Sequence, residues 1–210
     1  MLHNQLTAYV NTQLNNLFPD GYDCSKVISD NQDDAMSRLD YSLKKVKLPG
    51  YMRFSHLQSD LYAQYLYFLS NSIWINSQDK TAAEKIFYLN KALHGFNCMY
   101  NTVLPKIFLL IHCVGTVLGK AEYSDYFVAC HNVTIGSDKG FSPVLSEGVY
   151  MGPGSSIVGK CGVGSFTHMA INSVLMDQHS TGDCVIIGST PNQILKPLKR
   201  NLITGIYFEL

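Results

Sequence analysis

An apolar residue recurs at every sixth position through the second half of the chain. The series first runs through Ile111, Val117, Tyr123, Ala129 and Ile135, and after a step of ten it continues through Leu145, Met151, Ile157, Val163, Met169 and Leu175. An α-helix repeats every 3.6 residues and a β-strand every two, so neither explains a period of six. A six-residue repeat is typical of a parallel β-helix, in which three short strands form each triangular coil.

Small or compact residues form a second register, four positions after most of the apolar ones. They are Gly115, Ala121, Val133, Val149, Ser155, Cys161, Thr167 and Ser173, with Phe127 as the bulky exception. The two registers predict apolar side chains inside a narrow prism and small side chains at its corners. A glycine-rich β-sandwich with a chance periodicity is the alternative.

The step of ten between Ile135 and Leu145 adds four residues to one coil, within the text "GSDKGFSP". In a solenoid, such insertions form surface loops, often on the working face. We therefore expect a loop that covers the substrate at this point.

The first hundred residues carry apolar residues at three-to-four spacing, which predicts helices over 61–75 and 81–95. Thr81 and Glu84 have the spacing of a capping box, and Gly95 is a suitable C-cap. A further helix is expected from Ser29 or Asp30 through "SDNQDDAMSRLDYSLKKVK". The text "PDG" at 19–21 predicts a turn before it.

These patterns give an α+β fold class: an α-helical N-terminal region followed by a parallel β-helix of hexapeptide repeats with one inserted loop. The expected division is a helical domain over 1–100, a β-helix domain over 101–190 and a C-terminal tail over 191–210. At 210 residues, one sizeable domain with a helical extension is a normal size.

Composition excludes several classes of partner and location. The chain has 16 basic and 16 acidic residues and no basic block, so nucleic acid is not an expected partner. Its apolar runs are too short to cross a membrane, and its N-terminus lacks the pattern of a signal peptide. The six cysteines show no CxxC spacing, which is typical of free thiols in a reducing compartment. We expect a cytoplasmic protein.

Two histidines, His112 and His131, lie nineteen residues apart in an apolar run. Three hexads make a coil of eighteen residues, so the two should lie on one face of neighbouring coils, offset by one position. If Ile111 points inward, strand alternation turns His112 outward, where its imidazole could accept a proton from a substrate. His131 is then expected nearer the interior or a corner, in a supporting role. A lone histidine is more often a structural residue, but the stacked pair favours a catalytic one.

Several segments are similar to those of a known family. "IHCVGTVLGKAEYSDYFVACHNVTIGS", "SPVLSEGVYMGPGSSIVGKCGVGSF" and "CVIIGSTPNQILK" resemble the motifs of hexapeptide-repeat, left-handed β-helix acyltransferases, and most closely the serine-acetyltransferase-like branch. The resemblance covers residues 100–196. It implies direct transfer of acetyl from acetyl-CoA, with His112 as general base and His131 in the catalytic pocket, and with no metal.

The resemblance also implies a donor groove between neighbouring prisms of a homotrimer, either single or as two stacked trimers. The residues expected to bind acetyl-CoA there are Gly136, Gly152, Gly154, Ser155, Gly159, Ala170 and Lys196. Glycine lets a backbone approach a ligand closely, and a lysine can meet the CoA phosphates. The same glycines could equally serve only to turn coil corners. Cys113, Cys130 and Cys161 are expected to be small fillers of coil positions.

The sequence departs from this family at positions that bear on the acceptor. Ile111 stands where the family has an aspartate before the histidine, and Ser142 stands where it has a second histidine. In the family these groups help to hold serine. Their absence argues against free serine as the acceptor. The resemblance to chains of bacterial surface-polysaccharide pathways, which acetylate sugars, implies a sugar hydroxyl in a surface polysaccharide or its precursor, with an amino sugar nitrogen and free serine for cysteine biosynthesis as the alternatives.

Two further alternatives remain. One is a non-catalytic scaffold, in which the β-helix only assembles the helical regions. The other is a metal-assisted hydrolase of the γ-carbonic-anhydrase type, which shares the β-helix and would need three zinc-binding histidines on neighbouring chains. His112, His131 and His168 are available, but His168 is expected at the end of a different face.

Overall fold

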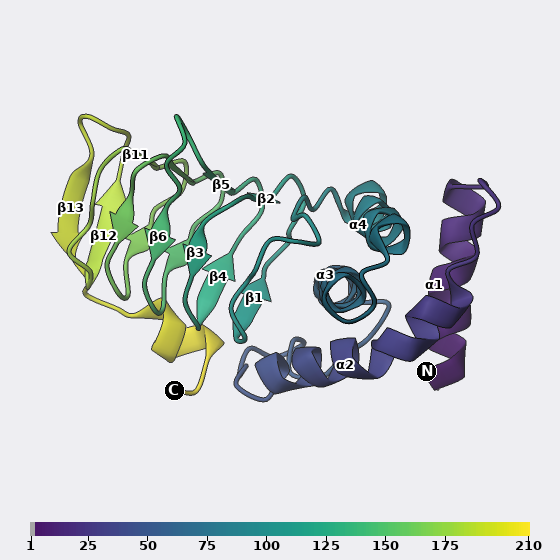
Figure 1. Cartoon of the computed structure of the whole chain (residues 1–210). Helices are drawn as coiled ribbons and strands as arrows, with labels where there is room; N and C mark the ends of the chain where they lie inside the picture. The colour runs from purple at the N-terminus through teal and green to yellow at the C-terminus, as the bar shows by residue number, and fades with distance from the viewer. Residues whose placement is uncertain (1–2) are drawn as a thin grey trace.

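The computed structural model describes residues 3–210 and has two parts, a group of four helices and a β-solenoid (Figure 1). The helices are α1 (His3–Leu17), α2 (Ser25–Leu43), α3 (Ser59–Ser77) and α4 (Lys80–His94). They gather at the end of the solenoid where its first strand lies (Figure 1). The predicted helical region followed by a parallel β-helix is confirmed. Within residues 3–210, no helix is long and apolar enough to cross a membrane.

The helices predicted over 61–75 and 81–95 correspond to α3 and α4. Gly95 ends α4 in the left-handed conformation, as predicted. The predicted capping box is wrong, because α4 begins earlier: the Asp79 side chain accepts a hydrogen bond from the Ala82 N–H at 3.0 Å. The turn at 19–21 lies between α1 and α2, as expected. Helix α2 begins at Ser25, where the Asp23 carboxylate accepts the Ser25 N–H, and not at Ser29 or Asp30.

The solenoid consists of short strands that pair in three sheets. Its strands are β1 (Phe108–Leu110), β2 (Val117–Leu118), β3 (Glu122–Tyr123), β4 (Phe127–Ala129), β5 (Thr134–Gly136), β6 (Val144–Leu145), β7 (Tyr150–Met151), β8 (Ser156–Val158), β9 (Gly162–Val163), β10 (His168–Met169), β11 (Val174–Met176), β12 (Cys184–Ile187) and β13 (Ile194–Pro197). The six-stranded sheet has the order β1-β4-β7-β10-β12-β13, the four-stranded sheet β11-β8-β5-β2 and the three-stranded sheet β3-β6-β9. All pairs are parallel except β12 with β13, whose antiparallel return ends the stack.

Most of the predicted hexad residues point into the prism, where eight of them are almost fully buried. They are Ala129, Ile135, Leu145, Met151, Ile157, Val163, Met169 and Leu175. The first coil is out of phase with the prediction. Leu110 pairs with Ala129 and Leu118 pairs with Ile135, so these two leucines, and not Ile111 and Val117, fill the core.

The inserted loop lies where the sequence predicts it. Thr134 pairs with Ser156, 22 residues on, whereas Ser156 pairs with Val174, 18 residues on. The four additional residues lie between β5 and β6, where Asp138 and Phe141 exchange two backbone hydrogen bonds. The coil therefore continues undisturbed on either side of the loop.

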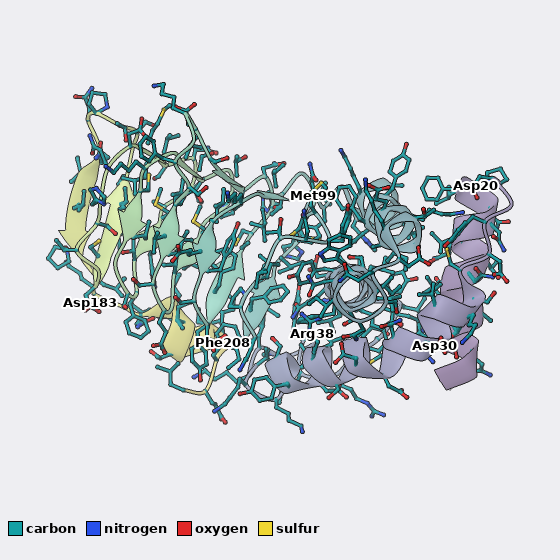
Figure 2. The ribbon with its side chains drawn as sticks, in the orientation of Figure 1. Asp20, Asp30, Arg38, Met99, Asp183 and Phe208 are labelled. Atoms are coloured by element: carbon teal, nitrogen blue, oxygen red, sulfur yellow. The ribbon has the colours of Figure 1, made fainter. Side chains whose placement is uncertain are left out.

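Helices α2 and α3 cover the open edge of the first coil. The Gln64 amide donates to the Phe108 carbonyl at 3.0 Å, and the Ser42 hydroxyl both donates to that carbonyl and accepts the Phe108 N–H. Arg38 joins the two helices by donating to Asn71 and Ser72 of α3 (Figure 2). An unpaired strand edge in the interior would leave polar groups without partners, so the helices complete the solenoid.

The segment after β13 returns along the outer face of the six-stranded sheet. It contains a short π-helix (Ile203–Tyr207), whose Tyr207 ring stacks on Tyr150 at 5.8 Å between ring centres. Phe208 is buried and forms a bridge with Val46, just after α2 (Figure 2). We refer to residues 198–208 as the C-terminal strap.

Truncating a residue inside the prism should destabilise the fold far more than truncating one at its rim. Ile157→Ala removes a fully buried side chain from the core and should lower the free energy of unfolding by about 2–5 kcal/mol. Ile171→Ala, at a position that is 68% exposed, should change it by no more than about 0.5 kcal/mol. Urea denaturation followed by circular dichroism measures both. Equal losses would contradict the packing described above.

Candidate active site

His112 lies in a turn that is two residues longer than the equivalent turn in the next coil. Leu110 pairs with Ala129, and the Val114 carbonyl accepts the Asn132 N–H, which puts Val114 in register with His131. Three residues therefore connect Leu110 to Val114, where one residue suffices in the next coil. His112 adopts a left-handed backbone conformation in this bulge, with φ +52°, and its side chain is 74% exposed.

A buried carboxylate from the helical region contacts this turn. Asp60, in the first turn of α3, accepts the His112 N–H at 2.9 Å and the Cys113 N–H at 3.1 Å. The Tyr51 hydroxyl donates to the same carboxylate at 2.6 Å. The His112 Nδ1 lies 3.8 Å from Asp60 Oδ2. Burial, followed by the hydrogen bond to Asp60, raises the pKa of Tyr51, so this hydroxyl remains a donor.

Asp60 is absent from the site residues predicted from the sequence. The available signal is that Asp60 is the sole charged residue of α3, a helix whose residues 60–73 are all buried. A charged group in such a helix requires a partner. Its partners lie 9, 52 and 53 residues away along the chain, so no local pattern indicates them.

His131 lies at the same corner as His112, but in register with Val114. The offset between the two histidines is therefore two residues and not the predicted one, because the bulge lengthens the first coil at this corner. His131 is half-buried and its carbonyl accepts the Gly154 N–H at 3.0 Å. The outward direction of His112 results from the bulge, and not from strand alternation after an inward Ile111.

Three cysteines of the solenoid are packing residues: two near this turn, Cys113 and Cys130, and one at the opposite edge of the four-stranded sheet, Cys161. Cys113, Cys130 and Cys161 are each no more than 4% exposed. Burial raises the pKa of all three thiols, most strongly for Cys113 beside Asp60. A thiol in such a setting stays protonated and is a poor nucleophile.

One edge of the prism leads from the His112 turn toward the C-terminus. The successive positions on this edge are Cys130 after β4, Gly152 after β7, Ala170 after β10 and Ile187 at the end of β12. The backbone N–H groups of the first three each donate to the next coil, which shows their register. A Cβ atom added at Gly152 would lie 2.6 Å from the Met169 carbonyl oxygen, so the packing between coils requires glycine there. Four coil spacings separate the His112 turn after β1 from Ile187 in β12, a distance of about 19 Å.

The other residues predicted to bind the donor lie in different places. Gly136 and Gly159 lie at the opposite edge of the four-stranded sheet, where the Gly159 N–H donates to the Gly136 carbonyl. Gly154 turns the corner beside His131 with φ +69°. The Ser155 hydroxyl is fully buried and donates to the Gly152 carbonyl at 2.7 Å. Only Gly152 and Ala170 share the edge that begins at His112.

Lys196 and Ala170 line a cavity of about 460 Å³ between the six-stranded sheet, β13 and the C-terminal strap. Its walls are largely apolar, and three cationic residues, Lys196, Lys199 and Arg200, also line it. The cavity thus combines an apolar floor with a concentration of positive charge.

His168 lies at the base of this cavity. It is 3% exposed, pairs with Tyr150 and Val185 on either side, and its Nε2 has no hydrogen-bond partner in the described chain. Burial lowers its pKa to about 4. His168 belongs to the same sheet as β1 and not to a different face, but it lies three strands away, about 14 Å. Within residues 3–210 of one chain, no group of three His, Cys, Asp or Glu side chains could hold a metal ion, so His112, His131 and His168 do not meet within a single chain.

Comparison with solved structures identifies the fold. A serine acetyltransferase from Brucella abortus superposes with a TM-score of 0.71 at 20% identity, covering 93% of this chain and 84% of that one. A serine acetyltransferase from Neisseria gonorrhoeae in complex with serine gives 0.69 at 19%, covering 94% and 84%. A serine acetyltransferase in complex with CoA gives 0.73 at 17%, covering 91% and 83%. No family model and no curated protein matches the sequence.

The likeness extends over both halves of the chain, the helical region included. The fold is that of the serine acetyltransferases. At identities of 20% or less, the comparison establishes this architecture and leaves the chemistry to be argued from the residues of the site.

The buried His168 should make stability depend on pH. Because its folded pKa is about 4 and the ordinary value is 6.5, the unfolded chain takes up a proton first as the pH falls. Stability from this group is complete above pH 6.5 and decreases down to about pH 4, by roughly 3 kcal/mol. The free energy of unfolding of His168→Phe should therefore fall less over that pH interval than that of the natural chain. Chemical denaturation at pH 7 and pH 4.5 tests this, and parallel losses would contradict it.

Proposed function

We propose that this protein is an acetyl-CoA-dependent acetyltransferase that transfers acetyl directly to a hydroxyl group, with His112 as general base. The observation that carries the proposal is the His112 turn: an exposed imidazole on a backbone held by a buried carboxylate, at one end of the edge that leads to the cationic cavity. The likeness to serine acetyltransferases supports the same class of reaction.

In the proposed reaction, the His112 imidazole takes the proton of the acceptor hydroxyl as its oxygen attacks the thioester carbonyl. The tetrahedral intermediate collapses with cleavage of the carbon–sulfur bond, and the CoA sulfur leaves with the proton from the imidazolium. The products are the acetyl ester and free CoA. No acyl-enzyme is required, in keeping with the protonated, buried thiols of this region.

The edge from Cys130 through Gly152 and Ala170 is the proposed track of the donor. A pantetheine arm is long and narrow, and positions without bulky side chains admit it closest to the backbone. Lys196, Lys199 and Arg200 would then meet the phosphates of CoA at the far end. A similar fold was solved in complex with CoA, which favours this donor.

For the acceptor, we favour a sugar hydroxyl in a saccharide. Ile111 and Ser142 offer no charge to pair with the amino and carboxylate groups of a free amino acid near the base. L-Serine is the second candidate, supported by the likeness to a serine acetyltransferase solved in complex with serine.

The test is release of free CoA from acetyl-CoA, measured with a thiol reagent, alone and with L-serine, nucleotide sugars or polysaccharide fragments. We expect stimulation by a saccharide, and loss of about 10²- to 10⁴-fold in kcat for His112→Ala. Stimulation by serine alone would support the second candidate instead.

His131→Ala is the matched control, because His131 lies at the same corner without Asp60. It should retain folding and lose less activity than His112→Ala. Undiminished turnover in His112→Ala would contradict the assignment of the base. No turnover with any acceptor, together with no binding of acetyl-CoA in calorimetry, would favour a non-catalytic scaffold.

We also propose that the protein assembles as a homotrimer through the outer face of its four-stranded sheet. The outward residues of this face are Val117, Thr134, Ser156 and Val174 in one row and Gly119, Gly136, Val158 and Met176 in the next. None of them is charged, and small residues in register make a flat surface suited to self-association. A neighbouring prism would also cover the exposed His112 turn, which borders this sheet.

A charge on this face should dissociate the assembly. Ser156→Glu, at the centre of the sheet, should convert a trimer to a monomer in sedimentation velocity at micromolar concentration, because each interface would bury an unpaired carboxylate. Thr181→Glu, at an exposed position outside this face, should leave the trimer intact. A natural chain that sediments as a monomer would refute the proposal.

A further inference from the structure

We infer that Asp60 is the positioning residue of the active site, and that the helical region thereby supplies the carboxylate that the solenoid lacks next to its histidine. This inference rests on the proposed function. It assigns to α3 a task in catalysis beyond covering the end of the solenoid.

Asp60 holds the backbone of the His112 turn. His112 holds a φ of +52°, which a residue with a Cβ atom rarely adopts without support. The two oxygens of Asp60 accept the N–H groups of His112 and Cys113, at 2.9 and 3.1 Å, and so fix two successive peptide units of the bulge. The orientation of the imidazole depends on this backbone.

A carboxylate suits this position better than an amide. Three donors converge on the Asp60 oxygens: two backbone N–H groups and the Tyr51 hydroxyl at 2.6 Å. A carboxylate accepts from all three, whereas an amide would direct its own N–H₂ group at one of them. Asp60 also lies in the first turn of α3, where free backbone N–H groups favour a negative charge.

Asp60 also lies close to the imidazole of His112. Asp60 Oδ2 lies 3.8 Å from His112 Nδ1, on the buried side of an otherwise exposed ring. A carboxylate on the Nδ1 side favours a proton on that nitrogen and leaves Nε2 as the acceptor for the substrate proton. It also stabilises the imidazolium that forms during transfer. At position 111, the adjacent residue is an isoleucine, which can do neither.

Tyr51 extends this arrangement into the connection between α2 and α3. Its hydroxyl is the third donor to Asp60, and its ring packs against the core. Tyr51→Phe removes one donor while the two backbone bonds to the turn remain, so its effect should be smaller than that of any change at Asp60.

The first experiment compares kcat and KM in Asp60→Asn, Tyr51→Phe and Gln64→Met with the natural chain. Gln64 is the matched control: it is buried one turn further along α3 and holds Phe108 of β1, away from the base. We expect a loss of about 10²-fold in kcat for Asp60→Asn, with the KM for acetyl-CoA within about twofold. Tyr51→Phe should lose about threefold to tenfold, and Gln64→Met less than about twofold.

Chemical rescue separates positioning from general destabilisation. In Asp60→Ala, added formate should restore a large part of the lost kcat, because a small carboxylate can occupy the vacated space beside His112. Formate should not restore His112→Ala. No rescue, together with equal losses in Asp60→Asn and Gln64→Met, would overturn the inference while the proposed function stands.

A measurement independent of activity tests the same contacts. Hydrogen exchange of a peptide that spans residues 110–115 should be at least about tenfold faster in Asp60→Asn than in the natural chain, because one of the two amides loses its acceptor and faces an N–H₂ group instead. Gln64→Met should not change it. Unchanged exchange in Asp60→Asn would refute the inference even if no acceptor is found, and absence of acetyl-CoA turnover in the natural chain would refute the proposed function alone.

Discussion

The open edge of the first coil is the constraint on which the rest of this structure depends. A solenoid strand that has a neighbour on only one side presents unpaired N–H and C=O groups on the other. At this end, Ser42 and Gln64 satisfy Phe108, and Asn97 pairs with the start of β2. The helical region is therefore part of the solenoid's hydrogen bonding, and its packing against β1 determines where the site can form.

The same edge explains how the His112 turn is supported in the first coil. An inner coil can also hold extra residues at a corner, as the insertion between β5 and β6 shows, where Asp138 and Phe141 exchange two backbone hydrogen bonds with each other. In the first coil, the two extra residues of the His112 turn face a helix instead of a strand. Asp60 accepts the N–H groups that a strand would otherwise have accepted. These two hydrogen bonds stabilise the bulge, and the bulge carries the histidine out of the core.

The sequence determined the architecture but not the site. Residues such as Met151, Ile157 and Leu175 keep their six-residue spacing because each coil repeats the same packing problem, so their burial could be predicted from spacing alone. The phase of the first coil could not, because Ile111 and Leu110 are both apolar and either one could fill the core position of the repeat.

The contacts that define the site connect distant parts of the chain. Asp60 meets His112 across 52 residues, and its role follows only when α3 lies against the turn. The start of α4 shows the same limit at short range. Thr81 and Glu84 have the right spacing for a capping box, yet Asp79 supplies the N-cap. Asp and Thr are both suitable N-cap residues, and here they lie within one turn of each other, so spacing alone does not decide between them. Periodicity predicts what repeats, and a functional site is by nature a departure from the repeat.

The C-terminal strap contacts the connection between α2 and α3, and this contact joins the two ends of the candidate site. The C-terminal strap, which closes the cationic cavity, ends beside the residues that follow α2: Lys47 donates its N–H to the Tyr207 carbonyl, and Glu209 donates to the Lys45 carbonyl. The connection between α2 and α3 begins at these residues. It contains Tyr51, whose hydroxyl donates to Asp60. The strap, which borders the proposed donor site, and the connection that contains Tyr51, which donates to Asp60, are thus anchored to each other. The residues proposed to bind the donor and those that hold the proposed base therefore share one set of backbone supports, at the point where the strap meets the helical region.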